Sequence, residues 1–109
     1  TLVKDVTPDM PMFEQETFGP ALSITTFSSI EEAIALSNNS KFGLGVSIFS
    51  EDTDAAEKLV PLFEEGAVFI NELVKSDPRL PFGGVKQSGY GRELSAHGIR
   101  EFCNRKQQK

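Results

Sequence analysis

The 109-residue chain is poor in the residues that build disulfides and zinc sites. It contains one cysteine, Cys103, and one histidine, His97. One cysteine excludes a disulfide within the chain and is typical of a reducing compartment, so we expect a cytoplasmic protein. One cysteine and one histidine are too few for a zinc site built from these ligands, so we expect no metal.

Long apolar stretches are also absent. No run approaches the roughly eighteen apolar residues that cross a bilayer, and no secretory signal is visible, so we expect no membrane partner. The first residue is Thr1 rather than Met, which leaves open that the chain is processed or is a piece of a longer protein.

Charge is unevenly distributed along the chain, whose net charge is −5. Residues 1–85 carry five cations and fourteen acids, whereas residues 86–109 carry six cations and two acids. A basic tail can bind nucleic acid. This one is short and lacks interleaved aromatic residues, so a solvated helical end is the preferred interpretation and no nucleic-acid partner is expected.

Hydrophobic periodicity predicts an α/β fold, in which a parallel sheet is linked by helical crossovers. Ser28 or Ser29 is expected to cap the first main helix, with Ser29 and Glu32 forming a capping box. Pro61 is expected to kink the second helix or to start a new short turn. The chain reads as one incomplete domain over residues 1–109. The predicted elements are strands at 1–6, 20–27, 46–50 and 67–71, helices at 28–39 and 51–63, a loop at 72–91 and a helical segment at 92–105 interrupted at Gly98.

The glycine-rich stretch PFGGVKQSGYGREL, residues 81–94, resembles a phosphate-binding loop only superficially. No lysine follows a glycine as the Walker pattern requires, and the dinucleotide pattern lacks its third glycine. A tight structural turn with close backbone approaches is therefore expected. A dyad of His97 with Ser95 or Cys103 is disfavoured, because Cys103 is expected to be a buried, inert thiol.

Glu16 and Phe18 are a candidate pair for binding a nucleotide. In an extended segment their side chains point to the same side of the backbone. A carboxylate accepts hydrogen bonds from a ribose diol, and an aromatic ring packs on a flat heterocycle. From residue types alone, a surface acid and a core Phe remain the default interpretation.

Four stretches together resemble one family. EQETFGPALSI, SNNSKFGLGVSIFS, EEGAVFIN and PFGGVKQSGYGREL occur in the same order as in the C-terminal part of the catalytic domain of NAD(P)-dependent aldehyde dehydrogenases. The resemblance covers Thr1 to about Lys106. The stretch INELVKSDPRLPFGGVKQSGYGREL is most similar to the succinate-semialdehyde dehydrogenase branch.

The resemblance implies specific roles in an oxidoreductase that uses NAD or NADP. Glu16 would bind the ribose on the nicotinamide side of the cofactor, and Phe18 would pack near the nicotinamide. The loop at 72–81 would border the aldehyde tunnel. Phe82 would sit near its substrate end, and Ser76 near the distal carboxylate of succinate semialdehyde.

The resemblance also shows what this chain does not contain. The family's cysteine nucleophile lies in a G-Q-x-C context upstream of the E-x-F-G-P motif, and this sequence has no G-Q-x-C. No catalytic residue is therefore assigned, and we expect the 109 residues alone to be inactive. We expect them to be a fragment whose partners are the rest of the parent enzyme, its aldehyde and further copies in a homo-oligomer. A non-catalytic structural or binding module derived from the same fold remains the alternative.

Overall fold

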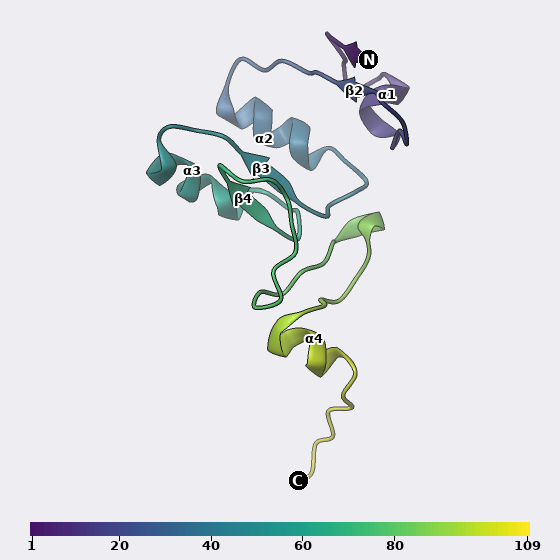
Figure 1. The fold of residues 1–109 in the computed structure, drawn as a ribbon, viewed down its shortest axis with the longest axis vertical. Coiled ribbons are helices and arrows are strands. Elements are labelled where there is room, and N and C mark those ends of the chain that lie inside the picture. Colours follow the sequence, from purple (N-terminus) through teal and green to yellow (C-terminus); the bar gives the residue numbers. More distant parts are fainter. The chain divides into compact units, whose positions relative to one another are not determined.

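In the computed structural model, which describes residues 1–109, the strands pair in parallel and helices lie between them in the chain (Figure 1). The contacts divide the chain into two compact units, Thr1–Lys41 and Phe42–Lys109. The first unit contains β1 (Leu2–Val3), α1 (Pro11–Glu14), β2 (Leu22–Ser23) and α2 (Ile30–Asn38). The second contains β3 (Val46–Ile48), α3 (Thr53–Leu59), β4 (Val68–Ile70) and α4 (Ser95–Glu101), with 3₁₀ turns at Val60–Leu62 and Lys86–Ser88.

The first parallel pair joins β1 to β2, with Leu2 opposite Leu22. Hydrogen bonds continue past the strands, from Ile24 N–H to the Val3 carbonyl (2.8 Å) and from Val6 N–H to the Ile24 carbonyl (3.1 Å). Val6 is buried there. The strand expected over residues 1–6 is shorter than predicted, because Asp5 adopts a left-handed backbone conformation with φ 58°.

Helix α1 is missing from the predictions. The prolines around residue 11 are expected only to break regular structure, yet Pro11 is the first residue of this helix. Proline is favoured at that position, because its φ is already helical and its missing N–H has no partner in the first turn of a helix.

The capping of α2 follows the sequence pattern closely. Ser29 is the N-cap, and its side chain accepts a hydrogen bond from Glu32 N–H (3.2 Å). The Glu32 carboxylate accepts hydrogen bonds from the N–H of Ser28 (2.7 Å) and from its hydroxyl (2.9 Å). The predicted capping box is therefore confirmed for Ser29, while the reciprocal bond uses Ser28 rather than Ser29.

The Glu32 contacts predict a pH-dependent start of α2. The Ser28 N–H, followed by the Ser28 hydroxyl, lowers the pKa of Glu32 below its ordinary value of 4.5. A lowered folded-state pKa gives stability that is complete above pH 4.5 and is lost as the pH falls through the folded pKa. We expect the Ser28 amide resonance to titrate in that acidic range in an NMR experiment, and Glu32→Gln to abolish the titration. A Ser28 resonance that is constant from pH 5 to pH 2 would contradict the contact.

The second unit is a β–α–β crossover. Strands β3 and β4 pair in parallel, with Val46 opposite Val68 and Ile48 opposite Ile70. Helix α3 lies between them in the chain and packs on β4 (Figure 1). Asp52 caps α3 by accepting a hydrogen bond from Ala55 N–H at 2.9 Å, and Ala56 is buried.

Pro61 ends α3 early. The α-helix stops at Leu59, and Val60–Leu62 form a 3₁₀ turn with proline near its start. Proline has no N–H to donate and its ring clashes with the preceding helical turn. The prediction of a new short turn at this position is confirmed.

The predicted α/β class with parallel strands and helical crossovers is confirmed, but the strands form two separate pairs instead of one sheet. Strand β2 pairs with β1 and not with β3, so each pair stays within its own compact unit. A strand's local sequence predicts its existence and does not identify its partner.

Little apolar surface is fully buried. Val6 and Ala56 are the only buried hydrophobic residues, and many large apolar side chains are exposed, including Phe49 at 66% and Phe102 at 94%. So many exposed large apolar side chains are typical of a chain that contacts other polypeptide. No helix in the structure has the length and apolar character needed to cross a membrane.

Candidate functional site

Asn71 marks the point where the chain leaves β4 for the predicted substrate loop. Its N–H donates to the Ile48 carbonyl at 2.9 Å, which extends the β3–β4 ladder by one bond. Its side-chain amide accepts from Ser50 N–H (2.9 Å) and donates to the Ser50 carbonyl (2.8 Å). Its φ of 54° is a left-handed conformation that asparagine tolerates better than most residues. Asn71 therefore ends the sheet and fixes where the loop begins.

Two ion pairs shape the loop at 72–81. Arg79 donates to both carboxylate oxygens of Asp77, with Nη2 at 2.6 Å from Oδ2 and Nε at 3.0 Å from Oδ1. This guanidinium, together with the Arg79 N–H, holds the pKa of Asp77 far below its usual range. Lys75 pairs with Glu72 at 3.2 Å. The charges of this loop are thus largely matched within the loop.

A pocket of about 300 Å³ lies between the start of β4 and this loop. Phe82, Lys75 and Asp77 line it together with Val68 and Phe69. Phe82 is half-buried, whereas Ser76 is exposed and is not among the lining residues. The structure therefore places Phe82 at a cavity beside the predicted substrate loop. It does not bring Ser76 into that cavity.

Residues 82–93 form a closed loop. Phe82 and Glu93 exchange two backbone hydrogen bonds, of 2.9 Å and 2.8 Å, as an isolated antiparallel bridge. Gly89 and Gly91 have positive φ values of 136° and 73°, which favour glycine. A Cβ at Gly83 would lie 2.7 Å from the Gly91 carbonyl oxygen. The predicted role of these glycines, tight turning and close backbone approach, agrees with this geometry.

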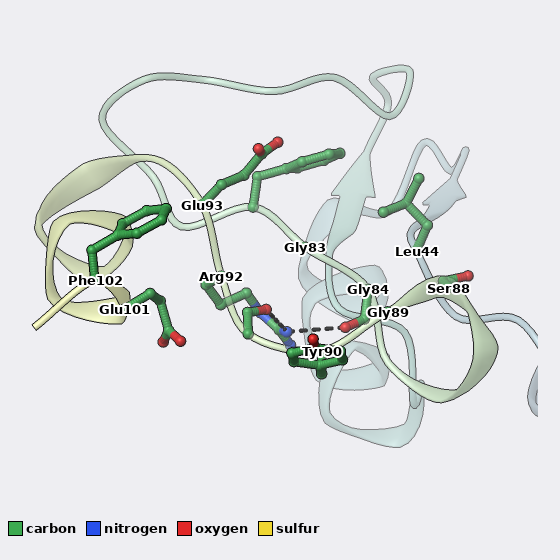
Figure 2. Close-up of a pocket in the computed structure, with 12 residues that line it drawn as sticks. Leu44, Gly83, Gly84, Ser88, Gly89, Tyr90, Arg92, Glu93, Glu101 and Phe102 are labelled. Atoms are coloured by element: carbon green, nitrogen blue, oxygen red, sulfur yellow. Dashed lines mark hydrogen bonds between the residues drawn. The ribbon is translucent and has the colours of Figure 1, made fainter. Parts of the chain in front are cut away.

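A second pocket, of about 470 Å³, opens on this closed loop and on α4 (Figure 2). In the close-up, Arg92 lies at its centre, while Glu101 and Phe102 reach it from the end of α4. Arg92 Nη1 donates to the carbonyls of Gly91 (2.6 Å) and Gly84 (3.1 Å). Phe82 lines this pocket as well as the first one.

Glu16 and Phe18 lie in the first unit, in the segment between α1 and β2 that has no regular structure. Both side chains are exposed, Phe18 at 93%. The default interpretation of Phe18 as a core residue is therefore wrong in this chain. An exposed carboxylate and an exposed ring two residues apart are suited to contact a molecule outside the fold.

The predictions for the C-terminal segment need two corrections. Gly98 lies within α4 and is buried, and a Cβ there would come within 2.8 Å of the Glu93 carbonyl carbon. It serves close packing and does not interrupt the helix. Cys103 is exposed, not buried, and its Sγ donates to the Ile99 carbonyl at 3.5 Å. Apolar neighbours in the sequence predict burial only where other polypeptide covers them, and here Ile99 and Phe102 are exposed too.

Sequence reasoning overlooked Asn71 and Arg92 as residues that shape the site. An asparagine directly after an apolar strand is a recognisable signal for a left-handed residue. Arg92 has no comparable signal, because its partners are backbone carbonyls that local sequence does not specify. No group of three or more His, Cys, Asp or Glu side chains is arranged to hold a metal ion.

The class of protein follows from comparison with known families. The aldehyde dehydrogenase family matches residues 1–108, and the chain belongs to that family. Among curated relatives, it is 52% identical over 106 residues to a probable succinate-semialdehyde dehydrogenase [NADP(+)] from Synechocystis. That alignment covers 97% of this chain and 23% of the relative.

Solved structures show the same similarity. A succinic semialdehyde dehydrogenase from Streptococcus pyogenes in complex with NADP+ matches 94% of this chain with a TM-score of 0.90 and 47% identity. A betaine aldehyde dehydrogenase from Staphylococcus aureus in complex with NAD+ matches 93% with a TM-score of 0.88 and 35% identity. The chain covers 23% and 20% of these two proteins, so it spans less than a quarter of each.

Proposed function

We propose that this chain is part of the catalytic domain of an NAD(P)-dependent aldehyde dehydrogenase that oxidises succinate semialdehyde to the acid. The observation that carries the proposal is the 52% identity, over nearly the whole chain, to a relative named for that reaction and for NADP. The chain then forms one incomplete domain whose exposed apolar side chains contact the rest of a cytoplasmic, homo-oligomeric enzyme. The cysteine that attacks the aldehyde lies outside these 109 residues.

The exposed pair in the first unit is suited to a nicotinamide cofactor. Glu16 would accept hydrogen bonds from the ribose hydroxyls, and Phe18 would pack beside the nicotinamide ring; both side chains are accessible for this. When bound, the cofactor supplies the acceptor for the hydride that leaves the substrate. The contribution of this chain is to hold and orient that group.

The second unit would supply one wall of the aldehyde site. Phe82 lines the cavity beside the loop at 72–81 and would exclude water from the apolar part of the substrate. Ser76 is exposed on the same loop, where its hydroxyl would donate to the distal carboxylate. Asp77 and Arg79 neutralise each other, so this ion pair shapes the loop while leaving carboxylate binding to other groups.

A chimeric enzyme tests the proposal. In it, this chain replaces the matching 106-residue segment of the Synechocystis relative, and turnover of succinate semialdehyde is followed with NADP and with NAD. We expect turnover by the chimera and none by the purified 109-residue chain. Turnover by the chain alone, or a folded chimera that binds NADP and leaves succinate semialdehyde unchanged, would refute the proposal. The second outcome would favour a non-catalytic module.

Glu16→Gln tests the cofactor contact in that chimera. Losing a charge-assisted hydrogen bond to the ribose should raise the KM for NADP by about tenfold, with a smaller change in the KM for the aldehyde. Glu31→Gln is the matched control, because Glu31 is another exposed acid of the same unit, on α2. An unchanged KM for NADP in Glu16→Gln would remove Glu16 from the cofactor site.

A further inference from the structure

The Arg92 guanidinium donates hydrogen bonds to two backbone carbonyls of the loop in which it lies. Its Nη1 donates to Gly91, the residue before it, and to Gly84, eight residues earlier. Gly84 is buried and Arg92 is half-buried. A charge-assisted hydrogen bond to a buried carbonyl is stronger than a neutral one and is little weakened by water. Arg92 therefore links the two arms of the closed loop at 82–93, one arm leading away from Phe82 through Gly84 and the other returning through Gly91 to Glu93 (Figure 2).

The arm that holds Gly84 is also anchored to the β3–β4 sheet. The Gly43 carbonyl, just before β3, accepts from Val85 N–H (2.9 Å) and from Gly66 N–H (3.1 Å), and Gly43 N–H donates to the Ser88 hydroxyl (2.9 Å). These bonds fix the tip of the loop. They leave Gly83 and Gly84, two residues of high backbone freedom, between the anchored tip and Phe82.

Phe82 is the residue that depends on this arrangement. It lines both pockets and lies at the closed end of the loop, paired with Glu93. With Gly83 and Gly84 following it, the position of its ring depends on what restrains those glycines. The Arg92 guanidinium restrains Gly84 directly, and it restrains the opposite arm through Gly91.

We propose that Arg92 is a positioning residue for aldehyde binding, acting through the Gly84 and Gly91 carbonyls to hold Phe82 at the substrate end of the site. This inference rests on the proposed function. It assigns to Arg92 no contact with substrate or cofactor. It predicts that losing the guanidinium weakens binding of the aldehyde and leaves the cofactor site in the other unit unaffected.

The kinetic test uses the chimera with four changes: Arg92→Gln, Arg92→Lys, Phe82→Ala and the double variant Arg92→Gln/Phe82→Ala. Arg92→Gln should raise the KM for succinate semialdehyde about tenfold, the effect expected from one charged hydrogen bond, and leave the KM for NADP within about twofold. Arg92→Lys keeps the charge and should recover part of the loss. The double variant should be no worse than Phe82→Ala alone, because both changes act on one ring.

Lys86→Gln is the matched control. Lys86 is a cation of the same loop, but it pairs with the exposed carboxylate of Glu64 at 2.7 Å. Exposed ion pairs contribute little, so this variant should keep both KM values. Additive effects of Arg92→Gln and Phe82→Ala, or an equal fall in all kinetic constants, would overturn the proposal in favour of a general structural role.

Hydrogen exchange gives a readout that does not depend on turnover. In Arg92→Gln, peptides covering residues 82–93 should exchange faster than in the parent chimera, while peptides covering α2 should be unchanged. If the chimera fails to oxidise succinate semialdehyde, the proposed function fails, and the exchange result still decides whether Arg92 holds the loop at 82–93. Unchanged exchange at 82–93 would overturn the proposal. If Arg92→Gln does not fold, Arg92→Lys is compared with the parent instead and should show a smaller increase in exchange at 82–93.

Discussion

Gly66→Ala is expected to destabilise the protein by about 3 kcal/mol, the upper part of the range for overpacking a tightly packed site. A Cβ at Gly66 would overlap the carbonyl oxygen of Gly83 and come within 3.3 Å of Gly84 Cα. These are backbone atoms of the closed loop, and that loop is itself bonded to Gly43. The clash therefore has no flexible side chain that could move away.

The measurement is the apparent melting temperature of the chimera carrying Gly66→Ala. Gly19→Ala is the matched control, because a Cβ at Gly19 meets no atom of this chain within 4 Å and its φ is not positive. We expect the control to melt with the parent and Gly66→Ala to melt clearly lower, with a lower yield of folded protein. Equal melting of both variants would show that Gly66 and the loop at 82–93 do not approach each other this closely.

Asn71→Ala is the second change with a large expected effect. It removes both hydrogen bonds to Ser50, which contribute about 1 kcal/mol each. It also places a residue less tolerant of φ 54° at this position, which costs about 1 kcal/mol more. The total is about 3 kcal/mol. Because Asn71 fixes where the loop at 72–81 begins, and we propose that this loop borders the aldehyde site, the KM of the chimera for succinate semialdehyde should rise as well.

A graded series separates these contributions. Asn71→Gly keeps the backbone conformation and loses both side-chain bonds, so it should cost less than Asn71→Ala. Asn71→Asp keeps the acceptor for Ser50 N–H but turns a carboxylate oxygen toward the Ser50 carbonyl, so it should melt below the parent. Melting temperatures in another order would show that the amide does not bridge to Ser50.

Elements with strong local signals could be predicted from the sequence. The serine and glutamate around the start of α2 satisfy its first N–H groups whatever lies around them, and the cap appears as expected. Pro61 ends α3 for an equally local reason. No comparable local sequence signal specifies which strands pair. The strand over residues 20–27 could be located but not assigned its partner β1, and both strands proved shorter than predicted.

In the candidate site, too, features with local sequence signals could be predicted and features that depend on packing could not. The glycine turn could be predicted, since a cluster of glycines is a clear signal for tight turning, and Gly89 and Gly91 have positive φ. The burial of Gly98 and the exposure of Cys103 depend on which polypeptide packs against α4, and both expectations were wrong. The bonds of Arg92 to Gly84 and Gly91 depend on the loop conformation itself, so no spacing rule could reveal them.

The two fixed ends of the segment at 72–81 have a consequence for how this part of the family can vary. Asn71 secures one end on the sheet, and the Phe82–Glu93 bridge secures the other. Between them, the loop is joined to α4 by a backbone hydrogen bond from Ser95 N–H to the Pro78 carbonyl. The segment at 72–81 is thus held at both ends by residues outside it. Its residues can be replaced while the frame that carries Phe82 and the sheet stays as it is.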